Sequence, residues 1–193
     1  HVVDLNGAVQ GKAVNEKAVE AILEAVSIPV QLGGGIRSLK DVERWIEAGV
    51  SRVILGTVAV TEPEIVREAA RLWPEQIAVS VDVRAGKVAT QGWTESSDLD
   101  AVTVAKRFED AGVGALIITD IDRDGTVMGF NVEAFGAIAD AVAIPVIAAG
   151  GLATIDDIVK IKARKGVPIA GAVLGRALYN GAINPEEALK VAA

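Results

Sequence analysis

The residues best suited to proton transfer are carboxylates that directly follow short apolar runs. Asp82 follows Ile77–Val81, and Asp4 follows the apolar start of the chain. A carboxylate at the mouth of a buried strand is partly desolvated and can act as a general acid or base near neutral pH. Asp82 is therefore the first catalytic candidate, although each carboxylate could instead hydrogen-bond and cap a loop. Thr119 points away from Asp120 in its strand, so its hydroxyl could orient a substrate.

Glycine clusters follow two pairs of apolar runs and are the main binding signal. Glycine lets the backbone approach an anion closely, and the N-terminus of a following helix supplies N–H donors. The alternative is that these glycines only form tight turns. Two pairs at equivalent positions favour a substrate with a phosphate at each end. The predicted phosphate-binding residues are Gly34, Gly35, Gly56 and Thr57 in one half and Gly150, Gly151, Gly175 and Arg176 in the other.

Asp4 and three further residues are predicted to contact a substrate. Arg37 and Arg84 lie just after apolar runs, on the same side of the fold as the glycine clusters. Trp93 lies in the long segment that follows Asp82. Its indole could stack on a substrate as part of a lid, or it could simply anchor the loop.

These residues must be positioned by alternating strands and helices. The apolar runs are rich in Val and Ile without polar alternation, which is typical of strands buried on both faces. Amphipathic helical patterns separate them and cover Asn15–Val26, Leu39–Ala48, Asp98–Ala111, Glu133–Ala141 and Ile155–Ala163. The predicted strands are His1–Leu5, Ile28–Leu32, Arg52–Leu55, Ile77–Val83, Ala115–Ile121, Ile144–Ala148 and Gly171–Leu174. This pattern predicts a parallel α/β sheet, either doubly wound or closed into a (β/α)8 barrel.

An internal repeat with an offset of 116 residues favours the barrel. It carries Asp4 onto Asp120, Asn15 onto Asn131 and Asp41 onto Asp157. The strand that ends at Asp82 has no partner in the first half of the repeat. We therefore expect residues 1–193 to form units 2–8 of a single (β/α)8 barrel domain, with an N-terminal unit of roughly 40 residues missing. Two sheet edges would then stay open and could mediate self-association, whereas a complete barrel is expected to be monomeric.

Composition narrows the function classes. The net charge of -7 argues against binding to nucleic acid or to an anionic membrane face. The chain has no Cys, and its only His is His1, so we expect no metal site and no cofactor held by thiolates or histidines. No apolar run is long enough to span a membrane and no secretory signal is visible, so a cytoplasmic protein that acts on a small molecule is expected.

The motifs together resemble a known family. Val3–Leu5, Gln31–Arg37, Val81–Arg84, Gly92–Trp93, Thr119–Thr126 and Val173–Ala177 are similar to the phosphoribosylformimino-aminoimidazole carboxamide ribotide isomerases of histidine biosynthesis, including their bifunctional variants. The related cyclase subunit of imidazole glycerol phosphate synthase shares the repeat but lacks the Gly-Trp loop and the Gly-Arg-Ala ending. An inactive, self-associating barrel fragment is a further alternative.

The resemblance implies an Amadori rearrangement, in which an aminoaldose becomes an aminoketose without metal or cofactor. It implies that two carboxylates act as acid and base, one from the first barrel strand and the other at Asp82, as the general acid. Thr119 matches the assisting hydroxyl, and Asp124 lies in a motif that contacts the substrate. Without the first strand and its Asp, the chain is expected to be nearly inactive.

Overall fold

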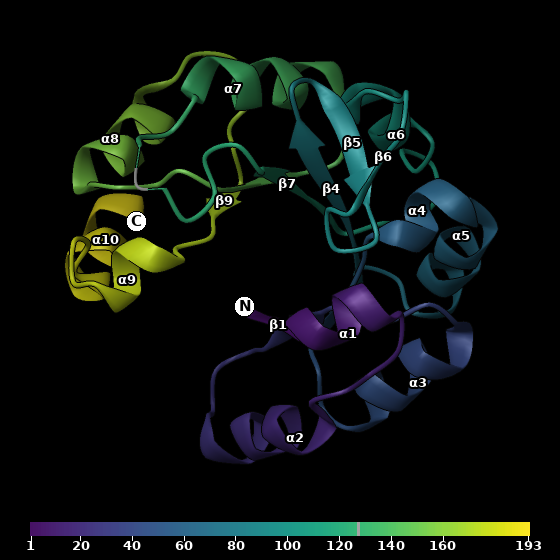
Figure 1. Ribbon diagram of the computed structural model, residues 1–193. Helices are drawn as coiled ribbons and strands as arrows, with labels where there is room; N and C mark the ends of the chain where they lie inside the picture. Colours follow the sequence, from purple (N-terminus) through teal and green to yellow (C-terminus); the bar gives the residue numbers. More distant parts are fainter. Residues whose placement is uncertain (127) are drawn as a thin grey trace.

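The protein is a curled parallel sheet with helices on its outer side, as seen in a computed structural model that describes residues 1–126 and 128–193 (Figure 1). Parallel pairing joins strands that follow one another along the chain, in the order β1-β2-β3-β4-β7-β8-β9. These strands are β1 (Val2–Val3), β2 (Gln31–Gly33), β3 (Arg52–Leu55), β4 (Ile77–Arg84), β7 (Ala115–Asp120), β8 (Val146–Ala149) and β9 (Gly171–Ala172).

The strand order distinguishes between the two predicted architectures. A doubly wound sheet reverses its strand order and carries helices on both faces. Here the order never reverses, and the helices lie along the outside of the curled sheet (Figure 1). The prediction of an α/β fold of the (β/α)-barrel class is therefore confirmed, and the doubly wound alternative is wrong.

The helices begin and end largely where the sequence signals fall. Proline occupies the first position of α5 and of α10, where its missing N–H costs little. The Asn184 side chain also caps α10, and side chains of Asp4, Asp100 and Asn131 cap the N-termini of three other helices. The helices are α1 (Leu5–Gln10), α2 (Glu16–Ala25), α3 (Leu39–Glu47), α4 (Thr57–Thr61), α5 (Pro63–Leu72), α6 (Ala101–Lys106), α7 (Val132–Ala141), α8 (Ile155–Ala163), α9 (Arg176–Tyr179) and α10 (Pro185–Ala192).

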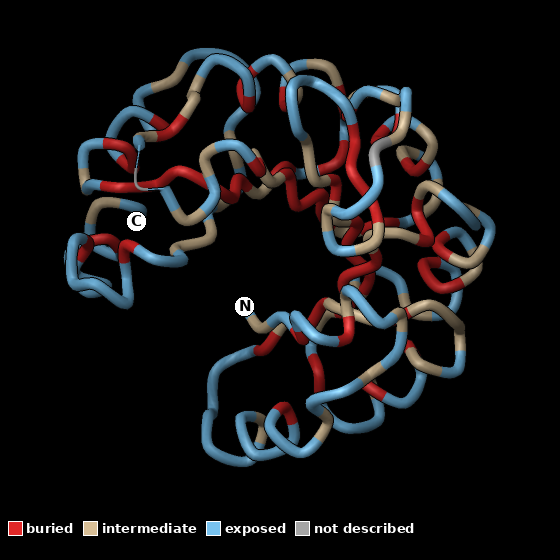
Figure 2. Tube along the Cα trace, viewed as in Figure 1, coloured by how far each residue is buried: buried red, intermediate tan, exposed pale blue. Residues whose placement is uncertain are grey.

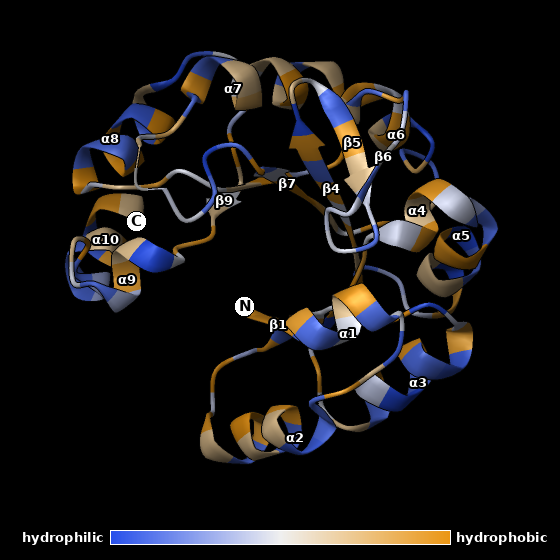
Figure 3. Ribbon diagram, viewed as in Figure 1, coloured by the Kyte–Doolittle hydropathy of each residue, from blue (hydrophilic) through white to orange (hydrophobic). Residues whose placement is uncertain are grey.

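Side chains of the central strands β3, β4, β7 and β8 alternate between two apolar layers. On β4, Ile77, Val79 and Val81 pack against the helices in the large outer core. Ala78, between them, belongs to a small inner layer with Ile54 and Ile117. Figure 2 shows the buried residues concentrated along the strands and the sheet-facing sides of the helices, and Figure 3 shows helices that combine hydrophobic and hydrophilic residues. The inner layer faces the concave side of the sheet.

Several elements differ from the predicted ones. The predicted strand His1–Leu5 is reduced to β1, because Asp4 caps α1 and Leu5 already lies in that helix. The strand predicted at Gly171–Leu174 is reduced to β9, and the helix predicted at Asp98–Ala111 to α6. The short helices α1, α4 and α9 were not predicted, because each has six residues or fewer and too few turns for an amphipathic period to show.

An antiparallel hairpin extends β4 beyond the barrel sheet. Strand β5 (Lys87–Thr90) pairs with the end of β4 and with β6 (Glu95–Ser96). The turn from β4 to β5 uses Ala85 and Gly86, both with positive φ. The sequence did not predict this hairpin, which carries Trp93 back over the concave side of the sheet.

The strands β1 and β9 lie at opposite ends of the sheet and, within the described residues, are not paired with each other. Figure 1 shows an opening between them, with α2 on one side and α9 and α10 on the other. The exposed Tyr179 of α9 lines a cavity there together with His1 and Pro29. In the part of the chain that the structure describes, no helix is long and apolar enough to cross a membrane.

Candidate active site

A cavity of about 400 Å³ lies at the carboxyl ends of the strands, where barrel folds place their active sites. The concave side of the sheet forms its floor, and the tip of the β5–β6 hairpin closes part of one side. Many of the predicted site residues line it: Gly34, Gly35, Arg37, Gly56, Thr57, Asp82, Trp93, Thr119 and Asp124. The structure thus brings together residues separated by up to 90 positions in the chain.

Asp82 is held in the cavity by two hydrogen bonds. The Ser80 hydroxyl, two residues earlier on the same face of β4, donates to Asp82 Oδ1 over 3.0 Å. The Trp93 indole Nε1–H donates to Asp82 Oδ2 over 2.8 Å. Both donors leave the carboxylate half-buried and oriented into the cavity, as a proton-transfer group requires.

Thr119 lies beside Asp82 on the neighbouring strand. The two residues are direct register partners in the parallel pair of β4 and β7. Thr119 lines the cavity, as does Ile117 two residues earlier, whereas Asp120 bears an ion pair with Arg123 at 3.4 Å. Thr119 therefore lies at the cavity, in agreement with its alternation with Asp120, and contact of its hydroxyl with a substrate stays a prediction.

Asp124 supplies a second carboxyl group to the cavity. Partial burial raises the pKa of Asp124 above its ordinary value, and the negative charge of Asp82 adds to the rise. The Gly125 backbone N–H and the charge of Arg176 act in the opposite direction but do not cancel it. A like-charged neighbour disfavours ionisation, so Asp124 keeps its proton to a higher pH than an isolated carboxyl group does.

The first glycine cluster forms a concave stretch of backbone. Gly34 and Gly35 have φ values of 99° and 77°, which only glycine adopts without strain. A side chain at Gly34 would also collide with the backbone of Asp4. Among the described residues, the backbone N–H groups of both glycines donate no hydrogen bond within the protein, so they are available to an anion. Gly56 and Thr57 border the same cavity.

The second glycine cluster has the same geometry. Gly150 and Gly151 have φ values of 89° and 87°, and their N–H groups likewise donate to no described residue. With Gly175, Arg176 and Asp124 they line a recess of about 50 Å³ next to the main cavity. The exposed guanidinium of Arg176 adds a positive charge beside the second glycine cluster. Beside the first cluster, the neutral Thr57 occupies the position after the strand-end glycine.

The hairpin tip, defined as Gln91–Trp93, is held to the cavity wall at several points. Its residues have φ values of 52°, 61° and 70°, an unusual run for two non-glycine residues. The Gln91 backbone N–H donates to Thr57 Oγ1 over 3.1 Å, and Trp93 donates to Asp82. Trp93 therefore lies over the cavity, where both predicted uses of its side chain, anchoring and substrate stacking, remain open.

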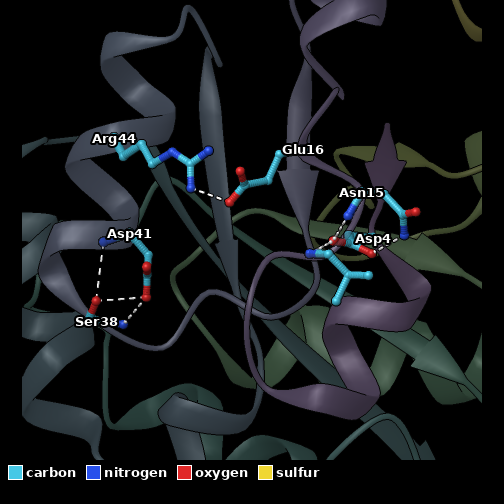
Figure 4. Close-up of polar contacts among 7 residues, drawn as sticks. Asp4, Asn15, Glu16, Ser38, Asp41 and Arg44 are labelled. Carbon is cyan, nitrogen blue, oxygen red and sulfur yellow. Dashed lines mark hydrogen bonds and ion pairs between the residues drawn. The ribbon is translucent and has the colours of Figure 1, made fainter. Parts of the chain in front are cut away.

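The Asp4 carboxylate is committed to its own loop. It accepts hydrogen bonds from the backbone N–H groups of Gly7 (2.9 Å), Val14 (2.7 Å) and Asn15 (2.9 Å), and from the Asn15 side chain (2.6 Å) (Figure 4). Burial alone would raise the pKa of Asp4, but these hydrogen bonds outweigh it and leave the pKa below its ordinary value. Asp4 does not line the described cavity, so a direct contact with a substrate stays a prediction.

We expect Asp4→Ala to lower the free energy of unfolding by about 2–4 kcal/mol, because three backbone donors lose their acceptor. Urea unfolding measures this, and Asp100→Ala is the control, since exposed Asp100 caps α6 through a single backbone N–H. The lowered pKa means that the Asp4 contribution is complete above its ordinary value of 3.8 and is lost as the pH falls below it. Equal effects of the two substitutions would contradict this account.

The two predicted arginine contacts differ in their position. Arg37 lines the cavity, packs against Gly11, and has a buried Nη2 without a hydrogen-bond partner among the described residues. Arg84 instead donates to the Trp93 carbonyl over 3.4 Å and lies 3.8 Å from Asp122. Arg84 thus supports the hairpin and is absent from the described cavity lining, so its contact with a substrate stays a prediction.

Sequence reasoning missed the residues that orient others. Ser80 and Gln91 act through hydrogen bonds to Asp82 and Thr57, and only the position of Ser80 two residues before Asp82 could have pointed to such a role. Within the described residues, no group of three or more His, Cys, Asp or Glu side chains is arranged to hold a metal ion.

The fold and the cavity define a barrel-class protein whose candidate site lies at the carboxyl ends of the strands. The site has two carboxyl groups and two glycine clusters, which we call the first cradle (at Gly34 and Gly35) and the second cradle (at Gly150 and Gly151). Comparison with known proteins agrees: the family described as "Histidine biosynthesis protein" matches residues 1–184. The chain belongs to this family.

Relatives show the same assignment over the whole chain. A protein of Caulobacter sp. (strain K31) is 70% identical over 193 residues, which are 100% of this chain and 80% of that protein. The Caulobacter vibrioides relative has the same identity and shares, and one from Parvibaculum lavamentivorans is 57% identical over 99% of this chain and 79% of its own. Each is named 1-(5-phosphoribosyl)-5-((5-phosphoribosylamino)methylideneamino) imidazole-4-carboxamide isomerase.

Proposed function

We propose that the protein is an aldose–ketose isomerase of histidine biosynthesis, which carries out an Amadori rearrangement on a phosphoribosylamino-imidazole carboxamide. The observation that carries this proposal is a cavity with carboxyl groups at its centre and a glycine cradle on each side. The names of the relatives include two phosphoribosyl groups, which corresponds to two cradles. The cyclase alternative is not favoured, since these relatives are named as isomerases.

Asp82 is proposed as the general acid that assists opening of the ribose ring. Its neighbour Asp124 has a pKa raised chiefly by burial, so Asp124 keeps its own proton to a higher pH than a solvated carboxyl would. Thr119, the register partner of Asp82, is proposed to orient the substrate at the reacting carbons. The Trp93 indole must exchange its hydrogen bond to Asp82 for contact with the substrate.

The cradles are proposed to bind the two phosphates through backbone N–H groups. Gly34, Gly35, Gly56 and Thr57 form one site. Gly150, Gly151, Gly175 and Arg176 form the other. The chain can bind anions in this way despite its net charge of -7, because the donors are local peptide groups.

A βα unit that precedes His1 is proposed to complete the barrel between β1 and β9. Three observations support it: the two strands are unpaired edges among the described residues, the repeat leaves β4 without a partner, and the chain spans about 80% of its Caulobacter relative. The same unit would carry the second catalytic carboxylate. The closed barrel is proposed to act as a cytoplasmic monomer.

The test supplies this unit in trans, as the part of the Caulobacter relative that this chain does not match, and measures isomerisation of the bis-phosphorylated substrate. Activity that depends on both polypeptides supports the proposal. A stable complex that binds substrate but gives no turnover would contradict the isomerase assignment. Self-association without uptake of the segment would favour the inactive-fragment alternative.

A further inference from the structure

Each glycine cradle is followed by a buried or half-buried aspartate in the first turn of the next helix. Asp157 lies in α8, is only 5% exposed, and bears no ion pair among the described residues. Asp41 occupies the same position in α3. The two aspartates are 116 residues apart, so they are equivalents in the internal repeat.

The Asp157 carboxylate holds the end of the second cradle. Its Oδ2 accepts hydrogen bonds from the backbone N–H groups of Ala153 (2.9 Å) and Thr154 (3.0 Å), and from the Thr154 hydroxyl (3.3 Å). Ala153 lies only two residues after Gly151. One oxygen thus fixes the chain where the cradle turns into the helix.

Asp41 makes the equivalent contacts in the first cradle. Its Oδ2 accepts from the N–H groups of Arg37 (3.3 Å) and Ser38 (3.0 Å) and from the Ser38 hydroxyl (2.7 Å), and the Ser38 hydroxyl accepts from the Asp41 N–H (Figure 4). The residue before the N-cap, whose backbone N–H donates to the aspartate, is Arg37 in the first half and Ala153 in the second. Because the donors are backbone groups, the arrangement persists although the loop side chains differ.

These contacts exceed what helix capping needs. A capping box satisfies the N-cap and third-residue N–H groups. Here the carboxylate also takes the N–H of the residue before the N-cap, which belongs to the cradle. Each cradle is therefore fixed at both ends, by its strand on one side and by the aspartate on the other, while the N–H groups of its paired glycines donate to no described residue.

We propose that Asp41 and Asp157 are positioning residues that hold the two cradles in the conformation that binds phosphate. The inference rests on the proposed function, because it assigns the cradles to phosphates. Neither aspartate touches the ligand. Each acts through the backbone of its own loop, so each should affect one phosphate site and not the other. Misplaced N–H donors weaken binding steeply, because hydrogen-bond strength depends on distance and angle.

The test compares Asp157→Ala with Asp156→Ala, using inorganic phosphate as the probe. Asp156 is the matched control, since it is exposed, lies in the same helical turn, and carries the same charge. Amide hydrogen exchange of the wild-type chain should slow in both cradles when phosphate is added. Asp157→Ala should speed exchange at residues 150–154 but not at 34–38, and weaken phosphate binding at the second cradle about 10- to 100-fold.

Two further variants separate positioning from folding. Asp157→Asn keeps one oxygen that can accept from both N–H groups, so it should restore most of the affinity. Asp41→Ala should reproduce the effect in the first cradle alone. If Asp157→Ala only speeds exchange throughout β7 and the rest of the sheet, or if it binds phosphate like Asp156→Ala, the positioning role is wrong. Absence of phosphate protection in the wild-type chain would instead overturn the phosphate assignment, and the inference with it.

Discussion

Asp82→Asn is expected to lower kcat of the isomerase reaction about a thousandfold, within the range of a general acid–base catalyst. Asparagine keeps the size of the side chain, and its one oxygen can still accept from the Trp93 indole while its NH2 group donates to the Ser80 hydroxyl, but it cannot deliver a proton. The free energy of unfolding should therefore change little. The rate is measured with the preceding βα unit supplied, at saturating substrate.

The matched control is Asp110→Asn, which removes an equal charge from an exposed position outside the cavity. It should leave kcat unchanged. Retention of more than about a tenth of kcat in Asp82→Asn would show that Asp82 is not the principal acid. In that event kcat of Asp124→Asn should be measured, because Asp124 is the other carboxyl group of the cavity and would be the alternative acid.

Gly34→Ala should produce the largest loss of stability, about 3–5 kcal/mol in the free energy of unfolding. Two costs combine: a φ of 99° is strained for alanine, and its Cβ would collide with the carbonyl oxygen of Asp4. The backbone must shift to relieve the collision, so the first cradle should also lose its affinity for phosphate. Urea unfolding and phosphate titration measure the two effects.

Gly86→Ala isolates the conformational cost. Gly86 has a φ of 80° but has open space where a Cβ would stand. It should therefore lose only about 1–2 kcal/mol and leave phosphate binding intact. Comparable losses in the two variants would mean that the contact between Gly34 and Asp4 is not a rigid one.

The sequence predicted the barrel class because two signals agreed. Buried parallel strands leave continuous Val- and Ile-rich runs, and the repeat fixed which runs are equivalent. The glycines and Asp82 could be placed at one edge of the sheet for the same reason, since strand ends meet there. Thr119 could be oriented because side chains alternate along a strand.

The rest depended on contacts that no local pattern encodes. Asp4 reads as a strand-end carboxylate like Asp82, but its oxygens are taken up by N–H groups ten and eleven residues later. The raised pKa of Asp124 results first from its burial in the folded chain and then from the charge of Asp82, 42 positions away. The hairpin was missed because Lys87–Thr90 and Glu95–Ser96 are too short to show an alternating pattern.

The sequential order of the parallel strands has a consequence for how the protein is made. Each parallel strand pairs with the one that leaves the ribosome just before it, apart from the short hairpin between β4 and β7. Contacts between neighbouring units close shorter loops than contacts between distant segments, so they cost less loop-closure entropy. The sheet can therefore grow one βα unit at a time from its N-terminal edge during synthesis, and β9, at the opposite edge, pairs last.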